Sequence, residues 1–347
     1  MLPRTNIVQQ ATDERAKNQA AVPLCRRLSV APMMSYTDRH ARYLLRQISR
    51  RVLLYTEMIT ANAILRGDTK RLLDYHAEEH PIALQVGGSV PHDLAACARI
   101  AEDMGYDEIN LNVGCPSRDV QQGRFGACLM AEPNLVAACV GAMVTSVNIP
   151  VTVKTRTGID DQDAYEQLHH FVTTVATVGC RSFVIHARKA WLTGLSPKQN
   201  RDIPPLDYEK VFRLKMDVPC CEFILNGGVE SLDAATAHLA RIDGVMIGRA
   251  AYHTPYLLAD ADSRIFAVAR PAPSRRAVVE AYLPYVAAEY SRGTPLVRMT
   301  RHLTGLFNGW PGARSWRRAM SDGARCAGPS MVVQALNEIC PVHAATG

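Results

Sequence analysis

The chain alternates eight times between a short apolar, β-rich run and a segment of helix length. Helix-length segments at 92–104, 134–147, 164–177 and 232–239 separate several of these runs. The expected strands cover residues 28–31, 52–55, 82–86, 109–113, 151–154, 183–186, 223–226 and 244–247. Strand-helix alternation predicts a parallel sheet, and eight repeats over about 230 residues predict an α/β fold, a closed (β/α)₈ TIM barrel. A shorter doubly wound sheet is the alternative.

The pattern becomes purely helical after Pro271 and Pro273. We expect helices over 276–290, 296–307, 313–320 and 330–339, separated by Gly- and Pro-containing turns. These signals divide the chain into a mobile N-terminal tail (1–24), a TIM-barrel catalytic domain (25–263) and a small all-helical C-terminal domain (264–347). The tail carries scattered charges and no apolar block, so we expect neither a signal peptide nor an anchor.

Positive charge is concentrated in the helical part. From residue 264 onward there are eleven arginines, no lysine and four acidic residues, a net charge of +7 in a chain whose total is +6. The remainder therefore carries −1, and this asymmetry predicts a polyanionic partner for the helical domain.

The ten cysteines contain no C-x-x-C pair. Without a secretory signal they predict reduced thiols in the cytoplasm, and neither a zinc nor an iron-sulfur site is expected. No apolar run approaches the roughly 18 residues that span a bilayer, so no membrane association is expected.

One cysteine has an unusual setting. Apolar residues alternate with Asn110 and Asn112 in the run 109–113, which predicts a strand that leads into a loop carrying Cys115. Gly114 and Pro116 constrain the backbone on either side of it. A lone cysteine is commonly an inert buried side chain. The loop context favours a functional thiol instead.

In a (β/α)₈ barrel the chemistry lies at the C-terminal ends of the strands. Glycines follow the seventh and eighth expected strands and leave backbone N–H groups for a phosphate, to which Arg249 adds a charge. Lys154 and Gln85 suit a flat heterocycle with imide-like hydrogen bonding. His186 either completes that site or is a core histidine. No Rossmann or P-loop motif occurs, so a phosphate plus a ring points to FMN.

Several segments resemble the tRNA-dihydrouridine synthases, specifically the A-type bacterial subfamily. The resemblance is continuous from about residue 27 to 258, and LFNGWPGARSWRR is similar to the family's helical RNA-binding domain. The barrel segments that carry it are LSVAPMM, LYTEM, ALQVGG, DEINLNVGCPS, GRFGACLM, VTVKTRTGIDD, HARKAWLTGLSPKQNR, IPPLDY, NGGV and DGVMIGRAAYHTPYL.

The resemblance implies that FMN passes hydride from N5 to C6 of a tRNA D-loop uridine, and that Cys115 protonates C5. NADPH would reduce the flavin, and positions 20 and 20a are the expected targets. A free thiol with a pKa near 8.5 is mostly protonated at pH 7 and can act as the acid. We expect a cytoplasmic monomer. The implied FMN-binding residues are Pro32, Met33, Met34, Gln85, Lys154, His186, Asn226, Gly227, Gly228, Gly248 and Arg249.

The target base must leave its stack, which places RNA-binding residues around the site. Any one of these arginines is better explained as a solvated surface charge, whereas the group on two helices favours phosphate contact. Trp191 either stacks on a base or holds its loop. The expected tRNA-binding residues are Asn112, Arg188, Lys189, Lys198, Arg201, Arg298, Arg301, Arg314, Arg317 and Arg318.

Some positions depart from the family pattern. Ser35 replaces the usual Asp, Thr155 and Thr157 replace more familiar residues, and Arg118-Asp119 is in reversed order. These departures bear mainly on which uridine is chosen.

Three other functions remain open. An FMN barrel reductase of a small pyrimidine or enone would use the same cofactor residues, but would have little use for the +7 helical domain. A lyase or aldolase acting through a Schiff base on Lys154 would leave Cys115 idle. A non-catalytic RNA-binding protein would bind tRNA without turnover. A flavin absorption band in the purified protein would exclude the lyase and the non-catalytic RNA-binding protein.

Overall fold

A computed structural model describes residues 24–325 and 327–341. The eight strands are parallel and pair in sequence order, and the eighth pairs with the first, so the sheet is a closed barrel. The expected TIM barrel is confirmed and the doubly wound alternative is wrong. The expected mobile tail lies outside the described residues, apart from Leu24. The strands are β1 (Leu28–Val30), β2 (Leu53–Thr60), β3 (Ile82–Gly87), β4 (Glu108–Val113), β5 (Val151–Arg156), β6 (Ser182–His186), β7 (Glu222–Asn226) and β8 (Gly244–Ile247).

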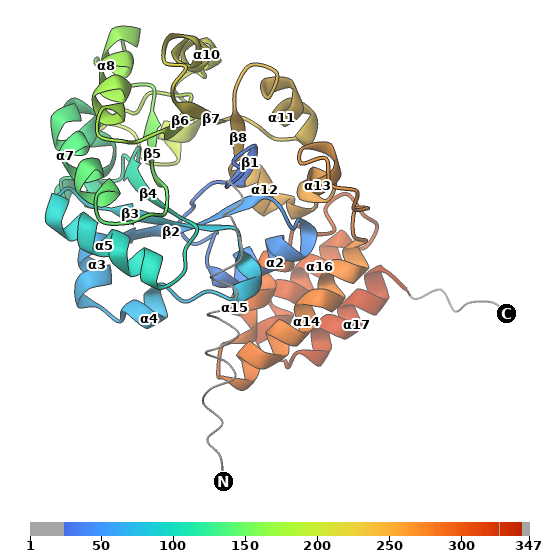
Figure 1. The fold of residues 1–347 in the computed structure, drawn as a ribbon. Helices are drawn as coiled ribbons and strands as arrows, with labels where there is room; N and C mark the ends of the chain where they lie inside the picture. The colour runs from blue at the N-terminus through green and yellow to red at the C-terminus, as the bar shows by residue number, and fades with distance from the viewer. Residues whose placement is uncertain (1–23, 326, 342–347) are drawn as a thin grey trace.

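Helices surround the barrel and connect its strands (Figure 1). The long helices α5 and α7 each begin at a proline, a residue that lacks the N–H that would stay unpaired in a first turn. The helices between β1 and the C-terminal segment are α2 (Arg39–Ile48), α3 (Ala61–Arg66), α4 (Thr69–Leu72), α5 (Pro91–Asp103), α6 (Arg118–Gln122), α7 (Pro133–Val144), α8 (Tyr165–Ala176), α9 (Gln199–Asp202), α10 (Tyr208–Asp217), α11 (Leu232–His238), α12 (Arg249–His253) and α13 (Ala261–Arg264).

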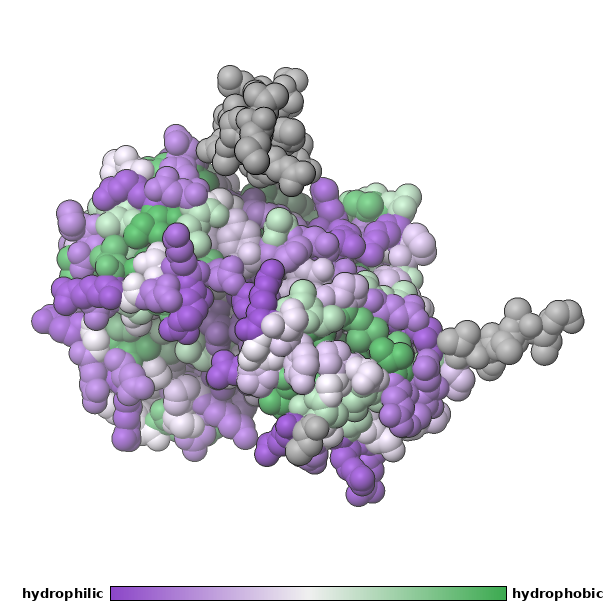
Figure 2. All heavy atoms as spheres, turned by 90° about the horizontal axis from the view of Figure 1, so that it is seen from below, coloured by the Kyte–Doolittle hydropathy of each residue, from purple (hydrophilic) through white to green (hydrophobic). Residues whose placement is uncertain are grey.

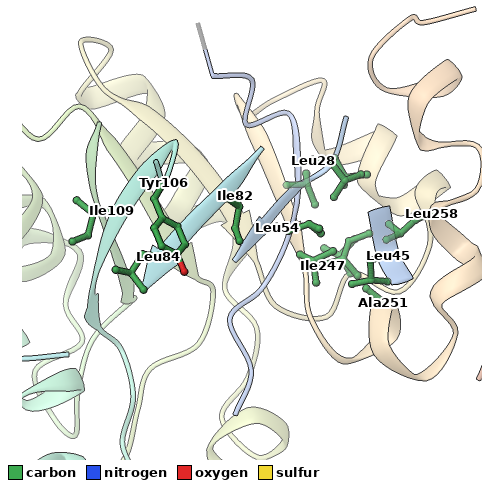
Figure 3. Close-up of a cluster of buried hydrophobic side chains, with 14 of the residues drawn as sticks. Leu28, Leu45, Leu54, Ile82, Leu84, Tyr106, Ile109, Ile247, Ala251 and Leu258 are labelled. Carbon is green, nitrogen blue, oxygen red and sulfur yellow. The ribbon is translucent and has the colours of Figure 1, made fainter. Parts of the chain in front are cut away.

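Successive side chains of a strand point to opposite faces, and in this barrel the two faces differ in polarity. The outer face packs apolar side chains such as Leu54, Ile82 and Ile247 under the helices, and Leu45 of α2 lies beside Ile247 (Figure 3). Burying each such side chain contributes about 1.5–3 kcal/mol. The inner face holds a smaller apolar cluster: Ala31, Leu53, Tyr55, Ala83, Val184, Ile224 and Met246.

β2 and β5 continue two or more residues beyond their expected C-terminal ends, and both changes concern polar residues near the candidate site. β2 continues to Thr60 after an irregular register between Tyr55 and Met58, so Glu57 lies within the strand instead of after it. β5 continues to Arg156, which pairs with His186 of β6. The sequence pattern places these strand ends too early because polar side chains, not apolar ones, occupy the inner face there.

Four helices follow the barrel and lie together against its α2 side (Figure 1). The contact between the two parts includes buried aromatic side chains. The Tyr285 ring of α14 stacks on the Tyr43 ring of α2 at a centroid distance of 4.1 Å, and the Tyr285 hydroxyl is 2.7 Å from His40 Nδ1. The helices are α14 (Arg275–Ser291), α15 (Leu296–Thr300), α16 (Ala313–Ser321) and α17 (Ser330–Ile339).

The helix expected over 296–307 is wrong in its length. The α-helix ends at Thr300 and a 3₁₀ turn, Arg301–Leu303, follows. Just beyond, Gly305 packs its backbone against the barrel segment at His253, where an added Cβ would come within 2.2 Å of the carbonyl oxygen. The chain therefore leaves the helix to make this contact with the barrel.

Candidate active site

Cys115 lies on the loop after β4 and is half-buried. The Asn112 side chain holds this loop, because its Oδ1 accepts hydrogen bonds from the backbone N–H of Gly114 (3.2 Å) and of Cys115 (3.0 Å). The thiol is 3.5 Å from Ser117 Oγ. The position of the thiol is thus coupled to a side chain of the barrel interior.

The loop returns past Cys115 at Gly126. The Gly126 φ of +77° lies in the left-handed region, and a Cβ there would stand 2.5 Å from the Cys115 carbonyl oxygen. That oxygen instead accepts a hydrogen bond from Ala127 N at 2.9 Å. Only glycine permits this close return, which allows the hydrogen bond to the Cys115 carbonyl.

Gln85 and Asn112, expected to bind cofactor and RNA respectively, are in direct contact. Asn112 Nδ2 donates to Gln85 Oε1 at 2.8 Å, and Gln85 Nε2 donates to Asn110 Oδ1 at 2.8 Å. All three amides are buried. Their orientations are therefore interdependent.

Lys154 and Asn226 come together across the barrel mouth, with Lys154 Nζ 3.0 Å from Asn226 Oδ1. Asn226 in turn donates to the Met246 carbonyl at 2.8 Å. Burial, and secondarily the charge of Arg156, lowers the pKa of Lys154 to about 7. No carboxylate among the described residues forms an ion pair with this lysine. An anionic ligand would supply the missing countercharge.

Arg156 is a residue that the sequence reasoning did not include in the site. Its Nε donates to the Gly114 carbonyl (2.9 Å), and its Nη1 donates to the carbonyls of Asn200 (2.9 Å) and Lys189 (3.2 Å). It thereby ties the Cys115 loop to the long loop after β6. Burial lowers the pKa of Arg156 to about 10, so it stays charged at neutral pH. Arg156 comes two residues after Lys154, and residues two apart in a strand point to the same face. This spacing was the sequence signal that could have placed Arg156 in the site.

His186 ends β6 and is buried beside the glycine pair after β7. Gly227 has a φ of +109°, and a Cβ there would come within 2.5 Å of His186 Cδ2, so the histidine requires glycine as its neighbour. Burial, followed by the charges of Arg156 and Lys154, lowers the pKa of His186 well below its ordinary value. The imidazole is therefore neutral at pH 7.

The expected phosphate-binding residues lie after β7, at Gly227 and Gly228, and after β8, at Gly248 and Arg249. The position that a Gly248 Cβ would occupy has no heavy atom within 4 Å outside its chain neighbours, so the backbone there is open. Arg249, the first residue of α12, already pairs with Asp202 through a 2.7 Å contact at the surface. In the loop after β1, Met33 is half-buried and its N–H donates to Thr37 Oγ1 at 2.9 Å, whereas Met34 is 63% exposed.

The basic residues of the loop after β6 differ in their contacts. Lys189 Nζ is 3.0 Å from Asp163 Oδ2 and 4.3 Å from the centroid of the Trp191 ring. The backbone N–H of Trp191 donates to Asn200 Oδ1 at 2.7 Å, so Asn200 holds the backbone of this loop. Arg188 donates to the Pro204 carbonyl, and its Nε is buried with no partner among the described residues. Lys198 and Arg201 are exposed.

The arginines of the helical segment that are expected to bind tRNA are exposed. In α16, Trp316 and Met320 are buried, while Arg314, Arg317 and Arg318 are exposed on the other face. Arg298 and Arg301 are also exposed, and Arg301 Nη2 donates to the carbonyl of Ser35 at 2.7 Å. Figure 2 shows one face of the molecule, on which hydrophilic residues are interspersed with neutral and hydrophobic ones.

The described residues hold no group of three or more His, Cys, Asp or Glu arranged to bind a metal. Among these residues, no helix is both long and apolar enough to cross a membrane. Every cysteine whose side chain the structure describes is a free thiol.

Sequence comparison finds similarity over nearly the whole chain. The family model "Dihydrouridine synthase (Dus)" matches residues 29–340. A tRNA-dihydrouridine(20/20a) synthase of Vibrio cholerae is 58% identical over 318 residues, which cover 90% of this chain and 96% of that protein. The protein of the same name from Escherichia coli K12 is 58% identical over 308 residues, 88% of this chain and 89% of that one.

Among solved structures, histamine dehydrogenase from Rhizobium sp. 4-9 matches with a TM-score of 0.50 at 12% sequence identity. The match covers 74% of this chain and 48% of that one, so the chain spans about half the length of that protein. At this identity the likeness concerns the fold alone, and it agrees with the closed barrel described above.

Proposed function

Because the chain belongs to the dihydrouridine synthase family, we propose that it reduces uridine to 5,6-dihydrouridine in the D-loop of tRNA, at positions 20 and 20a. The observation that carries this proposal is the Cys115 loop, which Asn112 and Arg156 hold at the mouth of the barrel. The relatives' shared name, tRNA-dihydrouridine(20/20a) synthase, supports the choice of substrate.

The flavin of this reaction is FMN in our proposal, and the polar residues at the strand ends fit it. Lys154 lacks a carboxylate partner among the described residues and suits an anionic ring edge, and Gln85 retains one N–H and one lone pair for the ring. The open backbone at Gly248 suits the phosphate. When bound and reduced, FMN supplies a hydride for C6 of the uracil. The remaining residues assigned to FMN are Pro32, Met33, Met34, His186, Asn226, Gly227, Gly228 and Arg249.

Cys115 donates the proton to C5 in this scheme. Hydride at C6 and the thiol proton at C5 together saturate the C5=C6 bond, and the thiolate left behind regains a proton from solvent. His186 is neutral, so it does not compete as a cationic acid. NADPH supplies the two electrons through the flavin, and the cysteine stays in its thiol oxidation state throughout.

The tRNA would lie across the barrel mouth and the helical domain, residues 264–347. The exposed arginines of that domain provide positive charge for phosphates, which is the dominant source of affinity for a nucleic acid. Unstacking the target base costs a few kcal/mol, less in a loop. The tRNA-binding set is Asn112, Arg188, Lys189, Lys198, Arg201, Arg298, Arg301, Arg314, Arg317 and Arg318. We further propose a cytoplasmic monomer.

The two half-reactions test this function separately. Wild type and Cys115→Ala are assayed for flavin bleaching by NADPH and then for dihydrouridine formation in unmodified tRNA. We expect Cys115→Ala to bleach normally and to form dihydrouridine about 10²–10⁴-fold more slowly, the range for loss of a positioned acid. Cys128→Ala is the matched control, because Cys128 is also a half-buried thiol of this loop but bonds the Phe125 carbonyl.

A Cys115→Ala enzyme that forms dihydrouridine at the wild-type rate would contradict the role of the thiol. A purified protein without a flavin absorption band would contradict the cofactor and favour a lyase acting through Lys154 or a simple RNA-binding protein. Turnover of small enones but not of tRNA would contradict the substrate.

A further inference from the structure

A chain of hydrogen bonds runs along the inner face of the barrel, from the N-terminal ends of the strands to the Cys115 loop. Its lower end is the buried carboxylate of Glu108, on β4. Glu108 Oε1 accepts hydrogen bonds from Thr152 Oγ1 and from Tyr55 OH, both at 2.6 Å. Glu108 Oε2 accepts a hydrogen bond from Arg26 Nε at 2.6 Å, so both oxygens of this carboxylate act as acceptors.

The upper part of the chain consists of three side-chain amides. Asn110 Nδ2 donates to Thr152 Oγ1, Gln85 Nε2 donates to Asn110 Oδ1, and Asn112 Nδ2 donates to Gln85 Oε1, each at 2.8 Å. The chain ends at the two backbone N–H groups that donate to Asn112 Oδ1. Every hydrogen bond therefore points in the same direction, from the loop down to Glu108.

The groups at the two ends of this chain fix the donor-to-acceptor direction of every hydrogen bond between them. A carboxylate can only accept a hydrogen bond, and a backbone N–H can only donate one. Thr152 must therefore donate downward and accept from above, and each amide must present its nitrogen downward and its oxygen upward. Reversing one amide would place two donors or two acceptors face to face at two points of a buried site, which is costly there.

We propose that Glu108 and Thr152 are positioning residues for the uridine reduction: they set the direction of the amide chain and thereby hold the Cys115 loop through Asn112. This inference rests on the proposed function. Neither residue belongs to the expected cofactor or tRNA set, and both act through Asn110, Gln85 and Asn112. One consequence is that Asn112 Oδ1 is fully used by the loop, so this amide has only an N–H left for the site.

Thr152→Val is the sharpest test, because valine has nearly the shape of threonine but can neither donate nor accept. The change leaves the ion pair of Glu108 with Arg26 in place. We expect kcat for dihydrouridine formation to fall about tenfold, since the amides above position 152 lose their fixed direction. The Kd for tRNA, which depends mainly on phosphate contacts outside this chain, should stay within about twofold of wild type, which a general loss of structure would not allow.

A second readout does not depend on turnover. Alkylation of Cys115 by iodoacetamide, followed on its peptide by mass spectrometry, should change in rate about threefold or more in Thr152→Val. Thr152→Ser should restore both the alkylation rate and kcat to within about twofold of wild type. Ser182→Ala is the matched control: this hydroxyl is also buried in a barrel strand, but it has no hydrogen-bond partner among the described residues, and neither readout should change.

Thr152→Ala and Thr152→Ser form a second pair, which differs by the hydroxyl oxygen alone and serves if the valine variant does not fold. The proposal would be overturned if Thr152→Val had the same kcat and alkylation rate as wild type. It would also be overturned if Thr152→Ala and Thr152→Ser had the same kcat and alkylation rate. Failure of the proposed function has a different signature, because wild type would then form no dihydrouridine. The alkylation comparison would still decide whether the hydroxyl of Thr152 holds the loop.

Discussion

Arginines at the barrel mouth and on helix α16 differ in burial and in hydrogen bonding. Arg156 is buried, and its guanidinium donates to three backbone carbonyls of two loops. Arg314 and Arg318 are exposed, and the structure gives their guanidinium groups no hydrogen-bond partner among the described residues. The first arrangement fixes atoms in place, whereas the second leaves charge on flexible side chains.

This difference indicates a division of labour between the two regions. Donors in a water-poor site act strongly and need no rearrangement during a reaction, so the barrel mouth suits chemistry. Exposed cations are screened by salt and adapt to the shape of a polyanion, so α16 suits binding. Substitutions in the mouth should therefore reduce kcat and stability, and substitutions on α16 should weaken binding alone.

Arg156→Met should have the largest effect. It leaves buried carbonyls of the Cys115 loop and of the loop after β6 without their donor, so we expect kcat to fall about 100-fold. The free energy of unfolding should fall by about 2–4 kcal/mol, measured by urea titration. Arg318→Met, the same exchange on α16, should change stability by less than about 0.5 kcal/mol. Equal stability of the two variants would contradict the contrast between buried and exposed arginines.

Replacing Arg314, Arg317 and Arg318 together by Gln should have the next largest effect. We expect the Kd for tRNA to rise about 10- to 100-fold at low salt, and the slope of log K against log salt to fall by about 2. Flavin bleaching by NADPH should be unchanged. Binding measured by filter retention across a salt series provides both quantities.

The control for this triple variant is a second triple variant that loses the same three positive charges on helices of the barrel. Arg66, Arg71 and Arg99 are exposed on α3, α4 and α5, and their replacement by Gln should change the Kd by less than about threefold. Equal weakening in both triple variants would show that net charge, not α16, drives binding. Removing the whole helical domain is a poorer experiment, because it would uncover the buried His40 and Tyr43 of α2, on which Tyr285 of α14 packs.

The pH dependence of stability should show the smallest effect. Burial lowers the pKa of Lys154 from 10.5 to about 7. Between these values the unfolded chain binds a proton that the folded chain does not, so this lysine makes stability rise as pH increases. The slope is at most about 1.4 kcal/mol per pH unit. Urea unfolding of the flavin-free protein at pH 6 to 9 should show a shallower rise in Lys154→Met; identical slopes would contradict the lowered pKa.

The sequence predicted the barrel because each strand is an apolar run whose neighbours in the chain are its neighbours in the sheet. It placed Cys115 on a loop for the same reason, from the alternation of 109–113. The arginine face of α16 also follows from helical spacing, since positions 314, 317 and 318 lie on one side of a helix. The ends of β2 and β5 were placed too early because polar inner-face residues interrupt the apolar signal there.

Contacts between residues far apart in the sequence could not be predicted from these local patterns. Nothing in the spacing indicates that Arg156 bonds Gly114, that Arg249 pairs with Asp202, or that Arg301 contacts the Ser35 carbonyl. The direction of the amide chain is another example, since Glu108 and Thr152 lie more than forty residues apart and their roles depend on side-chain geometry.

By itself, the sequence therefore determined the barrel, the helical segment, the position of the thiol and the location of the positive charge. These properties depend on local periodicity and composition, which the order of residues carries directly. Only the tertiary structure decided which donors meet which acceptors at the barrel mouth. Those contacts depend on closure of the barrel, which brings eight strand ends together to within side-chain reach.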